Sequence, residues 1–199
     1  PTGALTVGAD GTFDLNNFAH TVTDLSGAGA VTLGSATLTA GSTNDTTFSG
    51  VISGDGGLTK AGTGTLTLSG ENLYSGVTSI TAGTLQMGLS NAVPAGVLEV
   101  QTDGTFDLND FSQTVTDLSG AGAVTLGSAT LTAGSTNDIT FSGVISGTGG
   151  LTKVGTGTLT LSGENLYSGT TTVNGGVLKA GAAGAVPTGA LTVGADGTF

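Results

Sequence analysis

The residues with the most evident potential for chemistry are carboxylates that recur in the pattern Asp-Gly-Thr-Phe-Asp-Leu-Asn. The candidates are Asp10 and Asp14 in the first occurrence and Asp103, Asp107 and Asp110 in the second. Paired carboxylates could act in glycoside cleavage or, together with Asn16, bind calcium weakly. A catalytic site is normally one constellation, whereas this pattern is copied along the chain. We therefore expect turn-forming carboxylates, with weak calcium binding as an open alternative.

Other residue types that enzymes use are scarce. His20 is the one histidine, and Gln113 stands at the corresponding position of the second copy, so we expect a surface residue and not a general base. There is no Cys and no Arg, and no spacing typical of a zinc site, a phosphate-binding loop or a nucleophile elbow. The sequence predicts no enzymatic activity and no cofactor.

Composition and charge narrow the partners. Among 199 residues there are 38 Gly, 14 acidic residues and 3 Lys, for a net charge of −11. Without a basic patch, nucleic acid and anionic membrane surfaces are poor partners. No apolar run is long enough for a membrane span, and no signal peptide is visible. Hydrophobic residues make up 37% and recur regularly, which argues against disorder.

The chain repeats itself with a period of 93 residues. Positions 1–93 and 94–186 share 71 identities, and 187–199 repeats 1–13 letter for letter. Between 21–76 and 114–169 only three positions differ: Thr46 is Ile139, Asp55 is Thr148 and Ala61 is Val154. Such periodicity is typical of solenoids, in which each unit packs only on its neighbours. We expect units 1–93, 94–186 and 187–199 to form one continuous solenoid.

Short strands, and no helices, are predicted within each unit. Apolar residues alternate with Thr, Ala or polar residues in runs such as 4–7, 30–33 and 65–68, and Gly, Ser, Asn and Asp separate the runs. A closed antiparallel sheet and a parallel solenoid both fit eleven or twelve strands per unit. Medium-sized Leu, Val and Ile suit a narrow coil, so we predict an all-β parallel β-helix (β-solenoid) with about four three-strand coils per repeat.

One segment of each unit carries a sharper motif. Residues 56–86 read GGLTKAGTGTLTLSGENLYSGVTSITAGTLQ, and residues 149–179 read GGLTKVGTGTLTLSGENLYSGTTTVNGGVLK. Both resemble the passenger-associated transport repeat (autotransporter-associated β-strand repeat) of bacterial type V autotransporter passengers. The resemblance covers about a third of each unit. It implies a right-handed parallel β-helix on the surface of a Gram-negative cell, exported through a C-terminal barrel.

Structural roles can be assigned within the motif. We expect Leu66, Leu68, Leu159 and Leu161 to point inward, and glycines to make the corner. Asn72 and Asn165 should cap a turn through backbone groups, and Tyr74 and Tyr167 should close a loop with the hydroxyl in water. Lys60 and Lys153 share parity with Leu58 and Leu151, so we expect a bulge or a coil-edge ion pair with Glu71 or Glu164. The motif positions are Gly57, Leu58, Lys60, Gly62, Gly64, Leu66, Leu68, Asn72 and Tyr74, and Gly150, Leu151, Lys153, Gly155, Gly157, Leu159, Leu161, Asn165 and Tyr167.

These observations favour a non-enzymatic structural rod of an extracellular or outer-membrane-anchored bacterial surface protein. The alternative is a repeat-based adhesin that binds surface glycans or proteins of a host or neighbouring cell with avidity. Unpaired coil edges would favour self-association into filaments, end to end or laterally. Ice binding through arrays that include Thr65 and Thr67 is disfavoured, because the turns vary in length and the outer rows mix Thr with other residues.

Overall fold

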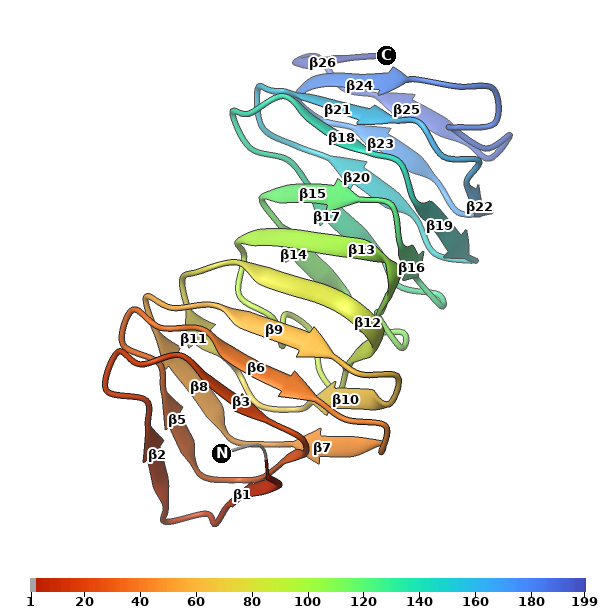
Figure 1. Ribbon diagram of the computed structural model, residues 1–199. Helices are drawn as coiled ribbons and strands as arrows, with labels where there is room; N and C mark the ends of the chain where they lie inside the picture. The colour runs from red at the N-terminus through yellow and green to blue at the C-terminus, as the bar shows by residue number, and fades with distance from the viewer. Residues whose placement is uncertain (1–2) are drawn as a thin grey trace.

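The computed structural model describes residues 3–199, which form 26 β-strands and no helix (Figure 1). The strand pairs are parallel, so the predicted parallel β-solenoid is confirmed and the antiparallel sheet of hairpins is wrong. Within these residues no helix is available to cross a membrane.

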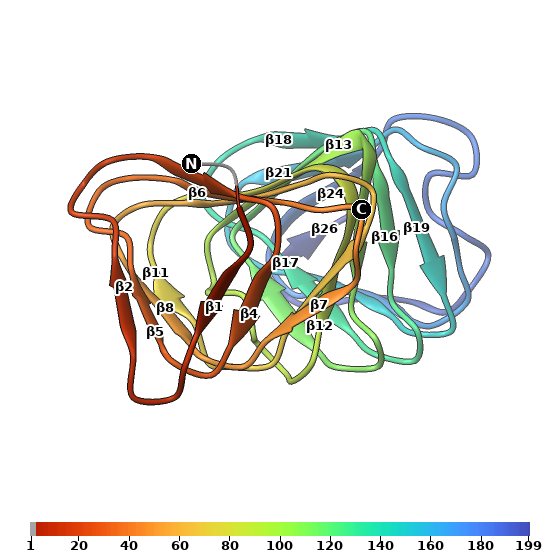
Figure 2. The same cartoon turned by 60° about the horizontal axis from the view of Figure 1, so that its bottom comes forward.

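Each coil takes about 20 residues. Paired residues on neighbouring coils are 18 to 21 positions apart, as for Phe13 with Val31, Leu5 with Leu25 and Leu85 with Phe106. The chain therefore makes about ten coils, each with up to three short strands joined by turns. Figure 2 shows the coils stacked one behind another from the N-terminal end to the C-terminal end.

The strands line three faces of the solenoid, and the long strands β12 and β13 join the first and second of these faces at one corner. The first face holds β1 (Leu5–Val7), β4 (Leu25–Gly27), β7 (Thr46–Phe48), β10 (Thr65–Leu68), residues 84–87 of β12 (Thr78–Met87), residues 105–107 of β13 (Val97–Asp107), β16 (Ala123–Thr125), β19 (Val144–Gly147) and β22 (Leu166–Tyr167).

The second face begins beside it and runs the length of the chain. It holds β3 (His20–Val22), β6 (Leu38–Gly41), β9 (Leu58–Ala61), residues 78–80 of β12, residues 97–100 of β13, β15 (Asp117–Gly120), β18 (Ile139–Phe141), β21 (Thr158–Leu161), β24 (Gly176–Ala180) and β26 (Gly197–Thr198).

The third face consists of a four-stranded and a five-stranded sheet. It holds β2 (Thr12–Asp14), β5 (Ala30–Thr32), β8 (Val51–Gly54) and β11 (Leu73–Tyr74), followed by β14 (Gln113–Val115), β17 (Leu131–Ala133), β20 (Leu151–Lys153), β23 (Thr171–Val173) and β25 (Leu191–Val193).

The coil and the sequence repeat have different lengths. At about 20 residues per coil, 93 residues make about four and two thirds coils, which is more than the four coils expected from the sequence. The sequence estimate was low because strand counting cannot find the coil length when successive coils differ in sequence.

The core is a narrow apolar column. Alternate side chains point inward, so that Leu66, Leu68, Leu159 and Leu161 are at most 3% exposed. Burial of each such side chain contributes about 1.5–3 kcal/mol relative to exposure, and this stabilisation accumulates from coil to coil.

Close backbone stacking at the corners requires glycine. A Cβ on Gly56 would collide with the carbonyl oxygen of Ala36 on the preceding coil, and the same holds for Gly149 and Ala129. Gly62 and Gly155 have φ of 72° and 70°, in the left-handed region that glycine adopts without steric penalty. The motif glycines therefore permit both the turn and the approach of the next coil.

Candidate functional site

The motif lysines lie inside the solenoid. Lys60, in β9, is 1% exposed, and its Nζ donates to the carbonyl oxygens of Ala61 (2.8 Å), Gly62 (2.8 Å) and Ala82 (3.1 Å). Ala82 belongs to the next coil, so the ammonium group joins two coils. An ammonium has three N–H donors, and here each of them has an acceptor.

The second copy has the same arrangement. Lys153 is 1% exposed, and its Nζ donates to the carbonyl oxygens of Val154, Gly155 (3.1 Å) and Gly175 (3.1 Å). The expected coil-edge ion pair with Glu71 or Glu164 is therefore wrong. Simple alternation from Leu58 and Leu151 places these lysines inward, and no bulge is needed, because corner carbonyls provide enough acceptors for the buried charge.

Burial affects the acidity of these lysines. Desolvation lowers the pKa of Lys60 to about 8, and the nearby charge of Asp45 opposes this shift. Desolvation likewise lowers the pKa of Lys153, against the charge of Asp138. At neutral pH the Lys60 ammonium form still predominates, which matches its three acceptors.

The motif asparagines join three successive coils. Asn72 Oδ1 accepts a hydrogen bond from Ile52 N (2.8 Å), and its Nδ2 donates to Gly70 O (3.1 Å) and to Ala92 O (2.8 Å). Ile52 and Ala92 lie one coil before and one coil after Asn72, which is 4% exposed. This side chain therefore supplies a buried N–H and two carbonyls with partners.

Asn165 repeats this pattern in the second copy. It accepts from Ile145 N (2.7 Å) and donates to Gly163 O (3.4 Å) and Ala185 O (2.6 Å). The sequence predicted backbone bonding for both asparagines, but a cap within one turn was too small a role, because their reach extends across three coils.

The motif tyrosines are internal as well. Tyr74 and Tyr167 are each 1% exposed, and their hydroxyl oxygens lie 2.7 Å from Thr78 Oγ1 and 2.6 Å from Thr171 Oγ1. The expectation that these hydroxyls reach water is wrong, because a threonine four residues later provides a buried partner. Burial raises the pKa of both tyrosines.

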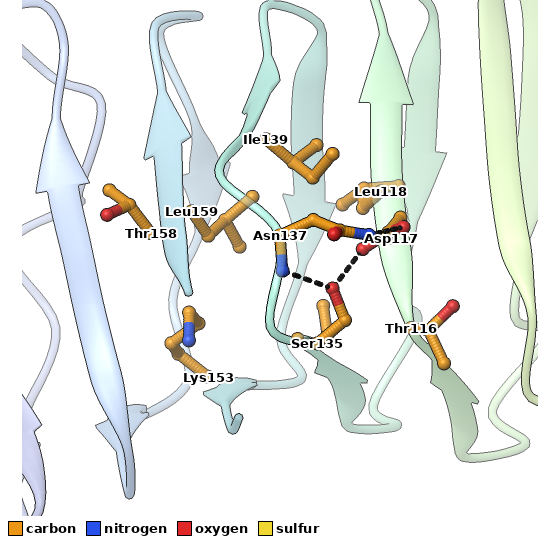
Figure 3. Close-up of a pocket in the computed structure, with 11 residues that line it drawn as sticks. Thr116, Asp117, Leu118, Ser135, Asn137, Ile139, Lys153, Thr158 and Leu159 are labelled. Atoms are coloured by element: carbon orange, nitrogen blue, oxygen red, sulfur yellow. Dashed lines mark hydrogen bonds between the residues drawn. The ribbon is translucent and has the colours of Figure 1, made fainter. Parts of the chain in front are cut away.

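A polar cluster that sequence reasoning missed lies next to Lys153 (Figure 3). Ser135 Oγ donates to Asp117 Oδ1, Asn137 N donates to Ser135 Oγ (3.0 Å), and Asn137 Nδ2 donates to Asp117 Oδ2 (2.9 Å). The cavity beside it measures about 10 Å³, which is room for no more than a single water molecule. In the first copy, Asp24, Ser42 and Asn44 form the corresponding cluster.

The signal that could have revealed this cluster is the coil length. Asp117 and Asn137 are 20 positions apart, as are Asp24 and Asn44, so a known 20-residue coil places each pair side by side. No histidine takes part in either cluster. In each cluster the serine hydroxyl donates to the aspartate and accepts from the backbone N–H of the asparagine, an arrangement that can hold the turn in place.

Three of the candidate calcium carboxylates accept hydrogen bonds from backbone groups, two within their own turns and the third from the next coil. Asp14 Oδ1 accepts from Asn16 N (2.8 Å), and Asp107 Oδ1 accepts from Asn109 N (2.9 Å). Asp110 Oδ1 accepts from Ser128 N and Oγ, and the backbone bond contributes most to lowering the pKa of this carboxyl.

The described residues 3–199 contain no group of three or more His, Cys, Asp or Glu side chains that could hold a metal ion. For Asp10 and Asp103 we identify no side-chain hydrogen bond, and weak calcium binding at these carboxylates stays a prediction.

The corresponding residues His20 and Gln113 differ in environment. His20 is partly exposed, and its ring lies edge-on to Phe13 with centroids 5.7 Å apart. Gln113 is 1% exposed and donates to Val93 O (2.7 Å) and Thr114 O (2.8 Å). The position is therefore a coil-joining position in the second copy, which the sequence did not indicate.

The buried lysines and asparagines of the motif therefore use their polar atoms in contacts within and between coils. No buried side-chain nitrogen or oxygen in the described part of the chain is without a hydrogen-bond partner. An arrangement of this kind can hold a backbone stack together, and its lysines and asparagines have no free donor directed at a ligand.

Comparisons with known proteins agree with the motif. Residues 58–87 and 151–180 match the passenger-associated transport repeat family. The adhesin BmaC autotransporter of Brucella suis biovar 1 (strain 1330) is 44% identical over 162 residues, which cover 77% of this chain and 5% of that protein. The chain thus spans about one twentieth of the relative's length. No solved structure matches the chain.

The position of the matches in the fold is informative. Each 30-residue match begins at the first residue of the strand that contains the buried lysine, continues through the asparagine and tyrosine, and covers about one and a half coils. The chain accordingly contains two passenger-associated transport repeats within one parallel β-solenoid.

Proposed function

We propose that this chain is a non-enzymatic shaft segment of a bacterial surface rod, which provides length and stiffness. The observation that carries this proposal is the use of the motif side chains. Lys60, Asn72 and their copies bond to the backbone of adjacent coils, so the most specific residues of the sequence stabilise stacking.

Regular stacking supports the same role. Partner strands continue across the junction of the two copies through β12 and β13, where residues 78–80 and 82–86 pair with 98–100 and 103–107. A rod made this way lengthens by one coil, about 4.8 Å, for every 20 residues or so. A 93-residue repeat then adds about 22 Å.

The proposal also includes a location at the cell surface and the absence of enzymatic activity. The relative is an autotransporter adhesin by name, so we place this chain outside the cell or at the outer membrane. The motif lysines and the aspartate–serine–asparagine clusters are engaged in turn and coil contacts, which supports a segment without enzymatic activity and without a cofactor. We also propose self-association through coil ends, because the last coil of any solenoid presents unpaired backbone N–H and C=O groups.

Adhesion is the second candidate, and the relative's name favours it. The repeat offers outward positions that differ between copies, such as Glu99 where the first copy has Thr6 and Lys179 where it has Gln86. Repeated weak contacts with glycans or proteins of another cell surface would gain avidity from the number of repeats.

Arrays of one, two and four 93-residue units separate the two functions. For a shaft, we expect the length measured by electron microscopy or X-ray scattering to increase by about 22 Å per unit, with no increase in binding to cell-surface material. An adhesin requires binding that rises steeply with the number of units. Such a rise, measured with purified surface glycans and with intact cells, would overturn the assignment as a shaft.

A further inference from the structure

The two copies of the repeat use different faces of the solenoid. Strand β2 lies on the third face, where it pairs with β5. The same residues of the second copy, 105–107 of β13, lie on the first face, where they pair with β16, the copy of β5. The first-copy strand β9 is on the second face, and its copy β20 is on the third.

All three faces change at the junction in the same sense. On the second face, Ser79 of the first copy is opposite Glu99, whose first-copy counterpart Thr6 is on the first face. On the first face, Gln86 is opposite Asp107, and its Nε2 donates to Asp107 Oδ2 (2.9 Å). On each face, the strands before the junction and the strands after it therefore come from different parts of the 93-residue repeat.

The third face makes the same transition through backbone and side-chain contacts. Asn72, beside β11, donates to Ala92 O one coil later. Gln113, a further coil along, donates back to Val93 O. Gln113 begins β14, the copy of β3, which in the first copy lies on the second face. The shift by one face is thus a property of the whole coil, and it follows from a repeat of about four and two thirds coils.

We infer that every repeat presents its surface on the next of the three faces, so that equivalent surface positions wind around the rod and return to one face after three repeats. Three repeats contain 279 residues, about 14 coils, and rise about 67 Å. The extension to a longer array rests on the proposed rod; the shift between these two copies does not.

The exposed leucines illustrate what this arrangement does. Leu73 and Leu166 occupy equivalent positions and are 69% and 66% exposed. Leu73 lies on the third face and Leu166 on the first. A repeat in phase with the coil would align these side chains on one side about every 22 Å and create an apolar stripe. The shift separates them in direction, which opposes side-by-side aggregation.

The shift from face to face also determines how often a given repeat surface recurs on one side of the rod. A flat partner, such as an opposing cell surface or a second rod alongside, meets a given repeat surface once every 67 Å or so. Single molecules that approach independently can reach it on every repeat, from three directions. A flat partner can therefore contact the same repeat surface on only about one repeat in three.

Pairs of spin labels in this chain test the shift. The chain has no native Cys, so labels attach only at introduced positions. The first double variant is Ser26→Cys with Ser119→Cys, which are equivalent positions in the two copies on different faces. The second is Ser26→Cys with Thr125→Cys, which lie on the first face five coils apart through Thr47, Thr67, Gln86 and Asp107.

Distances between the labels, measured by pulsed electron paramagnetic resonance, should order the two pairs. We expect about 24 Å along the axis for the pair on one face, and a separation longer by about 5–10 Å for the equivalent pair, because it also spans the width of the rod. An equal or shorter distance for the equivalent pair would show that the repeat is in phase with the coil and would overturn the inference.

A second set guards against a local perturbation by the labels. Thr47→Cys with Thr140→Cys is again an equivalent pair, and Thr47→Cys with Ser146→Cys is again on one face. Circular dichroism of each variant checks that the β-solenoid is retained. Because these distances lie within one chain, they do not depend on whether the parent rod is a shaft or an adhesin.

Discussion

The first and second transport repeats have the same internal contacts although they occupy different faces. Lys60 lies in a strand of the large sheet that contains the first and second faces, whereas Lys153 lies in a strand of the five-stranded sheet on the third face. Each lysine nevertheless donates to three carbonyls, at the next two residues and at a position 22 residues later. The distance along the coil therefore determines these contacts, and the face does not.

Substitutions of the glycines at which neighbouring coils stack most closely should have the largest effect, and they test whether the two copies are equivalent. Gly56→Ala and Gly149→Ala each place a Cβ against a carbonyl of the preceding coil, which no side-chain rotation can relieve. We expect each variant to lower the free energy of unfolding by at least about 4 kcal/mol, measured by urea denaturation. Gly8→Ala is the matched control, since a Cβ there meets nothing within 4 Å.

The equivalence requires the two variants to behave alike. Hydrogen exchange should show loss of protection around 36–56 in Gly56→Ala and around 129–149 in Gly149→Ala. A large effect in one copy with little in the other would mean that the face, and not the coil, determines packing.

The asparagines should have the next largest effect. Asn72→Ala and Asn165→Ala leave a buried N–H and two carbonyls without their side-chain partner, and we expect a loss of about 3 kcal/mol for each. Glu71→Ala and Glu164→Ala, at exposed neighbouring positions, should change stability by less than about 0.5 kcal/mol. If the asparagine variants match these controls, the bonds across coils contribute nothing, and the structural reading of the motif fails.

The lysines add a dependence on pH. Lys60→Met removes three hydrogen bonds but also removes a buried charge, so we expect a net loss of about 2 kcal/mol at pH 7. Burial lowers the pKa of Lys60 from 10.5 to about 8, so between these values the unfolded chain binds more protons than the folded chain. Stability contributed by this residue therefore rises with pH from about 8 and is lowest below 8.

Denaturation at pH 7 and at pH 9.5 measures this dependence. The rise should amount to no more than about 1.4 kcal/mol per pH unit for one lysine and should diminish in Lys60→Met. The exposed Lys179→Met is the control and should retain the rise. A pH dependence unchanged in Lys60→Met would place the titrating group elsewhere.

Much of the fold could be predicted from the sequence, because alternation and the 93-residue period both report on packing. The inward leucines, such as Leu66 and Leu159, follow directly from alternation. The burial of Lys60 follows from the same rule, but its charge argued for the surface, and its carbonyl partners come from a corner and a next coil whose geometry the sequence does not display.

The coil length was the main quantity that the sequence did not reveal. Residues on adjacent coils need only be apolar inside and small at the corners, so Leu85 can lie on Phe106 and Phe106 on Val124 without sequence similarity between coils. The similarity that is visible recurs at 93 residues, which is not a whole number of coils. The Asp117 cluster and the shift between faces both depend on that hidden length.

The tyrosines give the smallest and most direct comparison of the two copies. Tyr74→Phe and Tyr167→Phe keep the buried ring and remove one hydrogen bond, to Thr78 and Thr171 respectively. We expect each to cost about 1 kcal/mol, since the threonine hydroxyl is left buried with one partner fewer. Thr78→Val should cost a similar amount, and Tyr74→Phe with Thr78→Val should cost less than the sum, because both single changes remove the same bond. The same double-mutant cycle at Tyr167 and Thr171 gives the coupling energy in the second copy. Equal coupling energies would show that a transport repeat has the same internal energetics on whichever face it lies. Additive effects in either copy would mean that the hydroxyl pair there is not a stabilising bond.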